Sequence, residues 1–263
     1  MNFDANAILG LGYACFIVAF MLYLLRLTKA DEYFGAVGFG VLAGGLVLWA
    51  AALIWRSVER GMSIGHDRLI TAVAVLPGPL LFLPLSCGAI IAVIERVYGT
   101  RGFSPFVLFM MLGIGGYQLF TPTTLGLSPL WGDGWFVARY LVALLGYGML
   151  LVAGAIGVFE MLRPALGRRM QEYELLPTTT VESIAIQTMR WALILLTVSL
   201  AVSAIRSWLT SGNYWPWTLA DTWMLAVWAV CGAYLHAGRF RGWAIAIVLG
   251  MVLAAAAIRA LWR

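Results

Sequence analysis

The sequence has too few charged residues for a water-soluble protein. Only 11% of its 263 residues are Asp, Glu, Lys or Arg, and 62% are hydrophobic. A typical soluble domain carries roughly 25% charged residues, so the composition excludes a soluble globular protein. The net charge of +5 therefore indicates membrane orientation and contact with anionic lipids, and it does not indicate nucleic-acid binding.

Histidine and cysteine are also scarce. The histidines are His66 and His236, and the cysteines Cys15, Cys87 and Cys231 each lie alone in an apolar run. The sequence has no CxxC and no Cys/His metal spacing, which excludes a thiol redox motif and a c-type haem attachment site. It also lacks a nucleophile–base pair, paired catalytic carboxylates and HExxH, so we expect no catalytic activity from the chain itself.

Long hydrophobic runs dominate the sequence instead. A transmembrane helix needs about 20 mostly apolar residues to cross roughly 30 Å of hydrocarbon. Eight such runs predict an all-α, polytopic membrane helix bundle that forms one domain over residues 1–263. Prolines in the third run predict either a kinked helix or a helix whose freed carbonyls are satisfied by its neighbours. The predicted spans are residues 7–27, 34–55, 69–94, 104–121, 135–161, 184–209, 220–237 and 242–261.

Basic residues in the short loops predict the orientation of the bundle. Loops on the cytoplasmic side of a membrane protein carry an excess of Lys and Arg. If the N-terminus lies outside, the inner loops hold most of the loop arginines, among them Arg26, Arg96, Arg101 and Arg163. Asp4 makes the N-terminus acidic, which agrees with this orientation. We therefore predict that both termini lie outside.

Residues 211–236, SGNYWPWTLADTWMLAVWAVCGAYLH, form the most distinctive segment. Trp215, Trp217 and Trp223 crowd a predicted outer interface, and the chain then runs directly into the seventh span. Aromatic rings favour the headgroup level because the ring is apolar while the indole N–H needs a polar partner. Taken alone, the segment is typical of an aromatic belt.

The order of these residues resembles the tryptophan-rich WWD motif of the cytochrome c assembly protein family, the haem-handling membrane proteins called CcsA, ResC or CcmC. The family pattern runs W-G-x-Y-W-x-W-D-P-K-E-T-W, and the following helix ends in Y-L-H. The resemblance covers residues 134–263 well. It implies that a degenerate WWD loop, residues 211–223, lies on the outer face of a bacterial inner membrane. The matching positions are Gly212, Tyr214, Trp215, Trp217, Thr222, Trp223, Tyr234, Leu235 and His236.

The chain departs from the family pattern where the family binds haem. The resemblance implies a histidine at the outer end of span five, where this chain has Arg139. It implies a second after the last helix, where the sequence stops at Arg263, and a third in the first span, near Tyr23 and Leu24. A guanidinium stays protonated and cannot ligate iron. We therefore predict a divergent member that binds no haem alone, with haem shared with a partner as the open alternative.

Eight residues are candidates for a functional site. Placing an arginine such as Arg139 inside a membrane costs about 2.5–3.5 kcal/mol of free energy on insertion scales. Its guanidinium therefore either pairs with a carboxylate such as a haem propionate or snorkels to the interface. His236 and His66 are each a possible haem ligand. Alternatively, His236 is a headgroup-boundary residue beside Arg239, and His66 is a surface histidine paired with Asp67. The predicted haem or partner-docking platform is Tyr214, Trp215, Trp217, Asp221, Trp223 and Arg139.

Two functions follow from the resemblance. The first is a haem-handling protein of cytochrome c assembly, acting beside a partner that supplies the missing ligands. The second is a haem-free structural subunit of a membrane respiratory or electron-transfer complex, whose tryptophan loop docks a cytochrome or another subunit. Both imply membrane lipids, other membrane subunits and a cytochrome or apocytochrome as partners. A transporter is not supported, because no predicted span carries a polar pathway.

Overall fold

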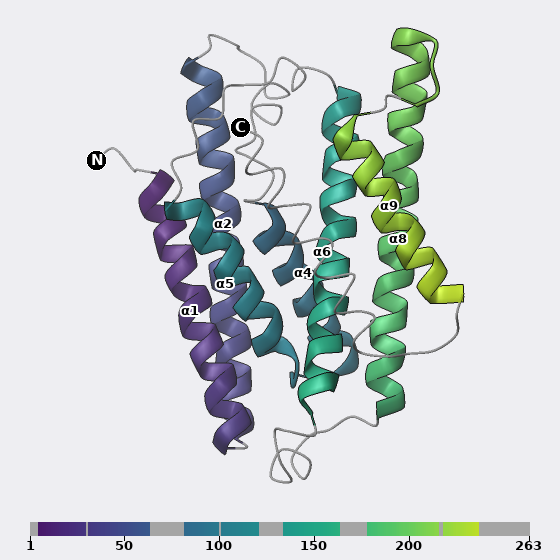
Figure 1. The fold of residues 1–263 in the computed structure, drawn as a ribbon. Helices are drawn as coiled ribbons and strands as arrows, with labels where there is room; N and C mark the ends of the chain where they lie inside the picture. The colour runs from purple at the N-terminus through teal and green to yellow at the C-terminus, as the bar shows by residue number, and fades with distance from the viewer. Residues whose placement is uncertain are drawn as a thin grey trace. The chain divides into compact units, whose positions relative to one another are not determined.

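The computed structural model describes residues 5–29, 31–63, 82–99, 101–120, 134–163, 178–215 and 218–236. Within these ranges every regular element is an α-helix, which confirms the all-α prediction (Figure 1). The helices fall into two compact units. Unit 1 contains α1, α2, α4 and α5, and unit 2 contains α6, α8 and α9. Whether the two units join into the single domain predicted for residues 1–263 stays a prediction.

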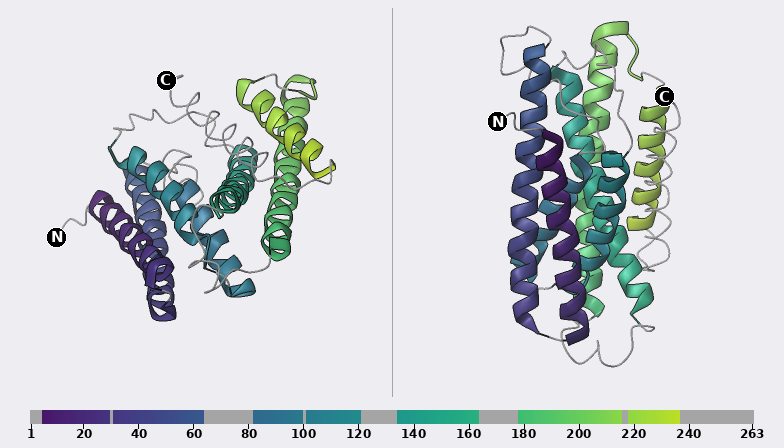
Figure 2. Two further views of the ribbon diagram at one scale, coloured as in Figure 1. Left: turned by 60° about the horizontal axis from the view of Figure 1, so that its bottom comes forward. Right: turned by 90° about the vertical axis from the view of Figure 1, so that its left-hand side faces the viewer.

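Unit 1 is built on a close pair of helices, α1 and α2, which run side by side in both views of Figure 2. Glycine lets the two backbones approach, because a Cβ on Gly45 would lie 2.9 Å from Cys15 Cβ. Phe16 and Trp49 then pack against each other, with ring centroids 5.5 Å apart. The helices of the unit are α1 (Ala5–Lys29), α2 (Glu32–Ser63), α4 (Phe82–Tyr98) and α5 (Ser104–Phe120).

Helix α5 is held to α1 by a polar contact as well as by packing. The Tyr13 hydroxyl donates a hydrogen bond to the Leu112 carbonyl over 3.0 Å. Gly116 makes room for this ring, because a Cβ there would lie 2.6 Å from the Tyr13 oxygen. The contact satisfies the phenol O–H of the half-buried Tyr13 within the bundle.

Unit 2 consists of α6 (Gly134–Leu162), α8 (Thr178–Ser211) and α9 (Leu219–His236). Helix α8 has 34 residues, which at 1.5 Å per residue makes it about 51 Å long, well beyond roughly 30 Å of hydrocarbon. Trp191 and Trp208 on α8 are both exposed. They lie about 25 Å apart along the axis, a spacing that suits two aromatic belts. Arg190, next to Trp191, is also exposed and lies at one of these belts.

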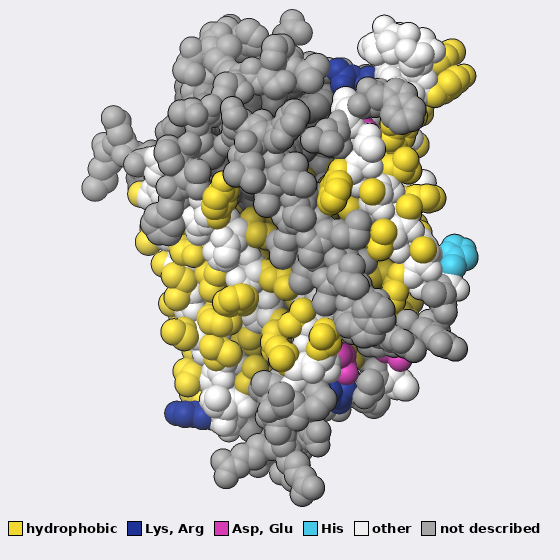
Figure 3. All heavy atoms as spheres, viewed as in Figure 1, with side chains coloured by type: hydrophobic (Ala, Val, Ile, Leu, Met, Phe, Trp, Pro, Cys, Tyr) yellow, Lys and Arg dark blue, Asp and Glu magenta, His cyan; other side chains and the backbone are white. Residues whose placement is uncertain are grey.

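Among the residues that the structure describes, four helices are long and apolar enough to cross a membrane: α1, the part of α2 up to Trp55, α6 from Ala138, and α8. The chain is therefore a polytopic helical membrane protein. On the face shown in Figure 3, hydrophobic side chains cover the middle of the described helices and charged side chains lie near their ends. Predicted span 242–261 and the first part of span 69–94 lie outside the described residues. Pro84 occupies the first turn of α4, where a missing N–H is tolerated.

Candidate functional site

The site begins at the N-terminus of α9, where Thr218 caps the helix. Its hydroxyl oxygen accepts a hydrogen bond of 3.2 Å from the Asp221 backbone N–H, and its O–H donates to Asp221 Oδ2. The sequence Thr-x-x-Asp is a helix-start signature, because the side chains satisfy N–H groups that have no partner inside the helix. The carboxylate also lies at the positive end of the helix dipole. Asp221 is thus placed by the local chemistry of its own helix.

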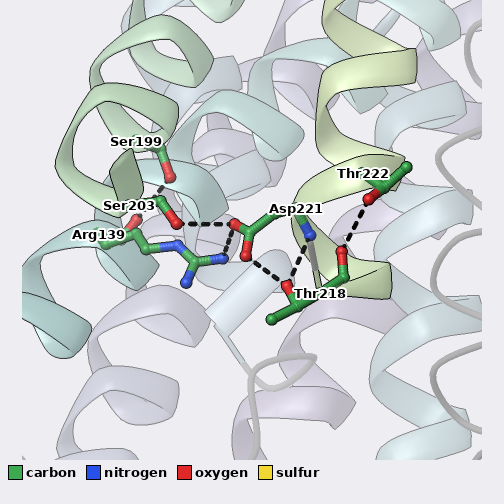
Figure 4. Close-up of polar contacts among 6 residues, drawn as sticks. All are labelled: Arg139, Ser199, Ser203, Thr218, Asp221 and Thr222. Carbon is green, nitrogen blue, oxygen red and sulfur yellow. Dashed lines mark hydrogen bonds and ion pairs between the residues drawn. The ribbon is translucent and has the colours of Figure 1, made fainter. Parts of the chain in front are cut away.

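Asp221 is also the meeting point of the three helices of unit 2 (Figure 4). Arg139, near the start of α6, donates from Nη2 to Asp221 Oδ1 and forms an ion pair with it. Ser203 of α8 donates to the same oxygen over 3.0 Å. Ser199, one turn earlier on α8, donates to the Arg139 carbonyl over 3.1 Å. We call Arg139, Ser199, Ser203, Thr218 and Asp221 the Asp221 knot.

The centre of the Asp221 knot is buried and electrically neutral, while Thr218 at its edge is exposed. The Asp221 side chain is fully buried and that of Arg139 is 14% exposed. A buried carboxylate is tolerated only when it is paired and hydrogen-bonded, and Asp221 has donors from Arg139, Ser203 and Thr218. The arrangement therefore positions helices. It has no uncompensated charge with which to bind an anion.

Sequence reasoning selected Arg139 and Asp221 separately, and the structure brings them together across 82 positions. It did not select Ser199, Ser203 or Thr218. Two signals could have found them. The Thr-x-x-Asp pattern marks Thr218 as a cap, and the four-residue spacing of Ser199 and Ser203 places both on one face of α8.

The exposed aromatic part of the site lies where α8 ends. Gly212 has a φ of +72°, a left-handed conformation that favours glycine, and its N–H bonds to the Trp208 carbonyl over 2.9 Å. The chain turns there, and Tyr214 stacks on Trp208 with centroids 5.9 Å apart and an interplanar angle of 11°. Tyr214 is 71% exposed and Trp208 is 48% exposed. Trp208 was not among the predicted platform residues.

Two of the three predicted tryptophans, Trp215 and Trp223, are among the described residues. Trp215 is half-buried, and Trp217 lies outside the described residues. Trp223 is half-buried in the first part of α9. Its indole nitrogen is buried and has no hydrogen-bond partner in the part of the chain that the structure describes.

Of the two predicted histidine ligands, His236 lies among the described residues. His236 is exposed at the end of α9, and its Nδ1 lies 2.8 Å from the Gly232 carbonyl oxygen. His66 lies outside the described residues. Within the described ranges, no group of three or more His, Cys, Asp or Glu side chains could hold a metal ion.

The described residues do not fit a haem held by two histidines. Arg139 occupies the position where the resemblance implies a ligand, and it is engaged by Asp221. Tyr23, in the region of the first span where another ligand is implied, is buried and donates to Glu95 over 2.8 Å. Neither side chain offers iron a neutral nitrogen. A bis-histidine site cannot be assembled from the described part of the chain.

Comparison with known proteins extends the resemblance over nearly the whole chain. It is 22% identical over 294 residues to "Cytochrome c biogenesis protein CcsA" of Synechococcus sp. (strain CC9902), covering 97% of this chain and 93% of that protein. It is 25% identical over 289 residues to the CcsA protein of Parasynechococcus marenigrum (strain WH8102), covering 95% and 91%. No family model matches the chain. The predicted resemblance to the cytochrome c assembly family is confirmed.

A solved structure shares the fold. The structure titled "Cytochrome c Heme Lyase CcmF" matches with a TM-score of 0.71 and 19% sequence identity. The match covers 95% of this chain and 46% of that protein, so the chain spans about half of the lyase. The arrangement of helices in this chain is therefore one found in a cytochrome c haem lyase.

Proposed function

We propose that this chain is a divergent, non-catalytic member of the cytochrome c assembly family that acts in cytochrome c assembly or haem handling together with a partner. It crosses a bacterial inner membrane eight times, with both termini and the loop 211–223 on the outer face. The observation that carries the proposal is the Asp221 knot. It fixes the tryptophan segment to two other helices of a chain that is similar to CcsA proteins over 97% of its length.

The knot and the exposed aromatics have different roles in this proposal. Asp221 and Arg139 are positioning residues, because each neutralises the charge of the other in an ion pair. Tyr214 and Trp208 form a flat exposed surface with Trp215 beside it. Aromatic faces bind other planar or apolar groups with defined geometry. The surface is therefore the docking point for an apocytochrome, or for a membrane partner that carries the haem ligands this chain lacks.

One observation favours a second function. The Asp221 knot is held together by its own side chains, because each of the six residues labelled in Figure 4 has a hydrogen-bond partner within unit 2. A site that needs no ligand suits a haem-free structural subunit of a respiratory or electron-transfer complex. In that function the same aromatic surface docks a cytochrome or another subunit.

Purification in mild detergent tests the proposal and separates it from the second function. We expect the isolated chain to show no Soret band from bis-histidine ligation. Arg139→His should not create such a band, because a second ligand is missing. Haem that co-purifies with assembly partners supports the assembly function. A stoichiometric set of cytochrome and iron–sulfur subunits supports the structural one. A stable haem spectrum from the isolated wild-type chain would contradict both.

Variants of the exposed tyrosines test the docking surface itself. Tyr214→Ala should reduce the recovery of the co-purified partner, because it removes one half of the stacked pair. Tyr33→Ala is the matched control, since Tyr33 is 69% exposed and Tyr214 is 71% exposed, but Tyr33 lies in unit 1. Equal recovery of the partner with both variants would show that the stacked pair does not dock it.

A further inference from the structure

A second polar cluster lies in unit 1, where α1 and α4 end and α2 and α5 begin. Glu95 of α4 is 4% exposed. It accepts a hydrogen bond of 2.8 Å from the Tyr23 hydroxyl of α1 and another from the Ser104 hydroxyl at the start of α5. Buried ionisable side chains in a membrane protein are costly and mark functional sites by default. The proposed function uses none of these residues.

Two arginine side chains, Arg101 and Arg26, interact electrostatically with this carboxylate. Arg101 Nε lies 3.7 Å from Glu95 Oε2, and Arg26 is 6% exposed in the last turn of α1. Both side chains converge on Gly35 of α2. A Cβ there would lie 2.7 Å from Arg26 Nε and 3.1 Å from Arg101 Nη1. Glycine at this position gives the guanidinium groups the space to approach each other, and the two positive charges exceed what the single Glu95 carboxylate can neutralise.

Arg101 is the residue of this cluster whose side chain a ligand can reach. Its side chain is 29% exposed, and its ion pair with Glu95 runs through Nε. The structure gives Nη1 and Nη2 no acceptor among the residues it describes. Arg101 precedes the first residue of α5, Ser104, so its guanidinium lies where apolar helix gives way to the polar end of the unit. The planar fork of a guanidinium matches the oxygens of a phosphate.

We propose that Arg101 and Arg26, set over Gly35, form a binding site for a phosphate group, supplied by the headgroup of a phospholipid. Basic pockets between transmembrane helices bind anionic headgroups in this way. Glu95 orients Arg101 through Nε and leaves the terminal nitrogens for the ligand. The site is separate from the Asp221 knot and does not depend on the proposed function.

Native mass spectrometry of the full chain with added lipids tests the site. The wild type should retain phosphatidylglycerol in preference to phosphatidylcholine. Arg101→Gln should weaken that retention about tenfold, which corresponds to about 1.4 kcal/mol. Arg96→Gln is the matched control, because Arg96 follows Glu95 on the same helix, is exposed and carries the same charge. It should leave the retention within about twofold.

A second measurement does not depend on the stability of the variant. Photoactivatable phosphatidylglycerol should crosslink the wild-type chain mainly at residues 101–104, the connection into α5. Competition with inorganic phosphate distinguishes the two possible sources of the phosphate group, a lipid headgroup and a free anion. If excess phosphate leaves the lipid preference unchanged, the site binds a headgroup. Phosphate binding that needs Arg101, without a lipid preference, assigns it to a free anion. Equal losses for Arg101→Gln and Arg96→Gln, or crosslinks spread evenly over the helix ends, would overturn the proposal.

Discussion

Replacing Asp221 with asparagine tests whether the Asp221 knot holds unit 2 together. Asparagine has the same shape, and its single side-chain oxygen can still accept a hydrogen bond from Ser203. Its NH2 group replaces the oxygen that accepts from Thr218, so at that contact the amide would have to donate to the Thr218 hydroxyl oxygen instead. The substitution removes the negative charge and leaves Arg139 largely buried without a counter-ion. Breaking a buried ion pair by removing one partner costs about 3–5 kcal/mol. Because both hydroxyl contacts can be kept, one of them with its direction reversed, we expect Asp221→Asn to lower the free energy of unfolding by about 3 kcal/mol.

A double-mutant cycle isolates the charge interaction from other effects of the substitution. Arg139→Gln alone should also cost about 3 kcal/mol, since it leaves the carboxylate uncompensated. The double variant Arg139→Gln/Asp221→Asn leaves no buried charge. It should cost about 3–4 kcal/mol instead of the sum of about 6 kcal/mol, which gives a coupling energy of about 2–3 kcal/mol.

Reversible unfolding in mixed micelles, with SDS added to a mild detergent, measures these free energies by tryptophan fluorescence. Glu160→Gln is the matched control, because Glu160, in the last turn of α6, pairs over 3.0 Å with Arg163, the residue just past the end of that helix. A pair at that spacing contributes only about 0.2–0.5 kcal/mol. If Asp221→Asn costs no more than Glu160→Gln, or if the two single effects add fully, the knot does not hold the helices and the reasoning fails.

Two further pairs of variants test unit 1 in the same unfolding assay. Gly45→Ala should cost about 1–3 kcal/mol, because its Cβ would meet Cys15 Cβ at 2.9 Å, whereas Gly44→Ala, with nothing within 4 Å, should be neutral or slightly stabilising. Tyr23→Phe should cost about 1.5–3 kcal/mol, because it removes a buried donor to Glu95. Tyr33→Phe, at an exposed ring, should change stability by less than about 0.5 kcal/mol. A reversed order within either pair would contradict the packing described for unit 1.

Hydrophobic runs predicted the helices well because a membrane span must be both apolar and long. The run 135–161 corresponds to α6 (Gly134–Leu162), and the run 104–121 to α5 (Ser104–Phe120). The prediction was too short at both ends for α8, which was expected over 184–209 and is observed over Thr178–Ser211. Hydropathy finds the part of a helix that lies in hydrocarbon, whereas backbone hydrogen bonding continues past the membrane surface. The ends of α8 are polar and were therefore missed.

The sequence predicted which residues belong to the site, but it did not predict which of them are in contact. Arg139 was selected because a guanidinium in a span needs an acceptor, and Asp221 because it remains from the family motif. Their pairing spans 82 positions, and no local pattern in the sequence specifies a contact at that distance. The stacking of Tyr214 on Trp208 was missed for another reason. It requires the chain to reverse at Gly212, and the left-handed conformation of that residue became apparent only from the structure.

The Asp221 knot gives a second reason to expect that Arg139→His alone creates no haem site. Arg139→His would supply an imidazole at the position where the resemblance implies a ligand, but it would leave the fully buried Asp221 carboxylate without its strongest partner. An uncompensated buried charge costs several kcal/mol, so the new histidine would be drawn to Asp221 as a cation and would not present a neutral nitrogen to iron. A change at Asp221 would have to come with it. The ion pair therefore links the helices of unit 2, as a shared ligand could, and it gives Arg139 a structural role.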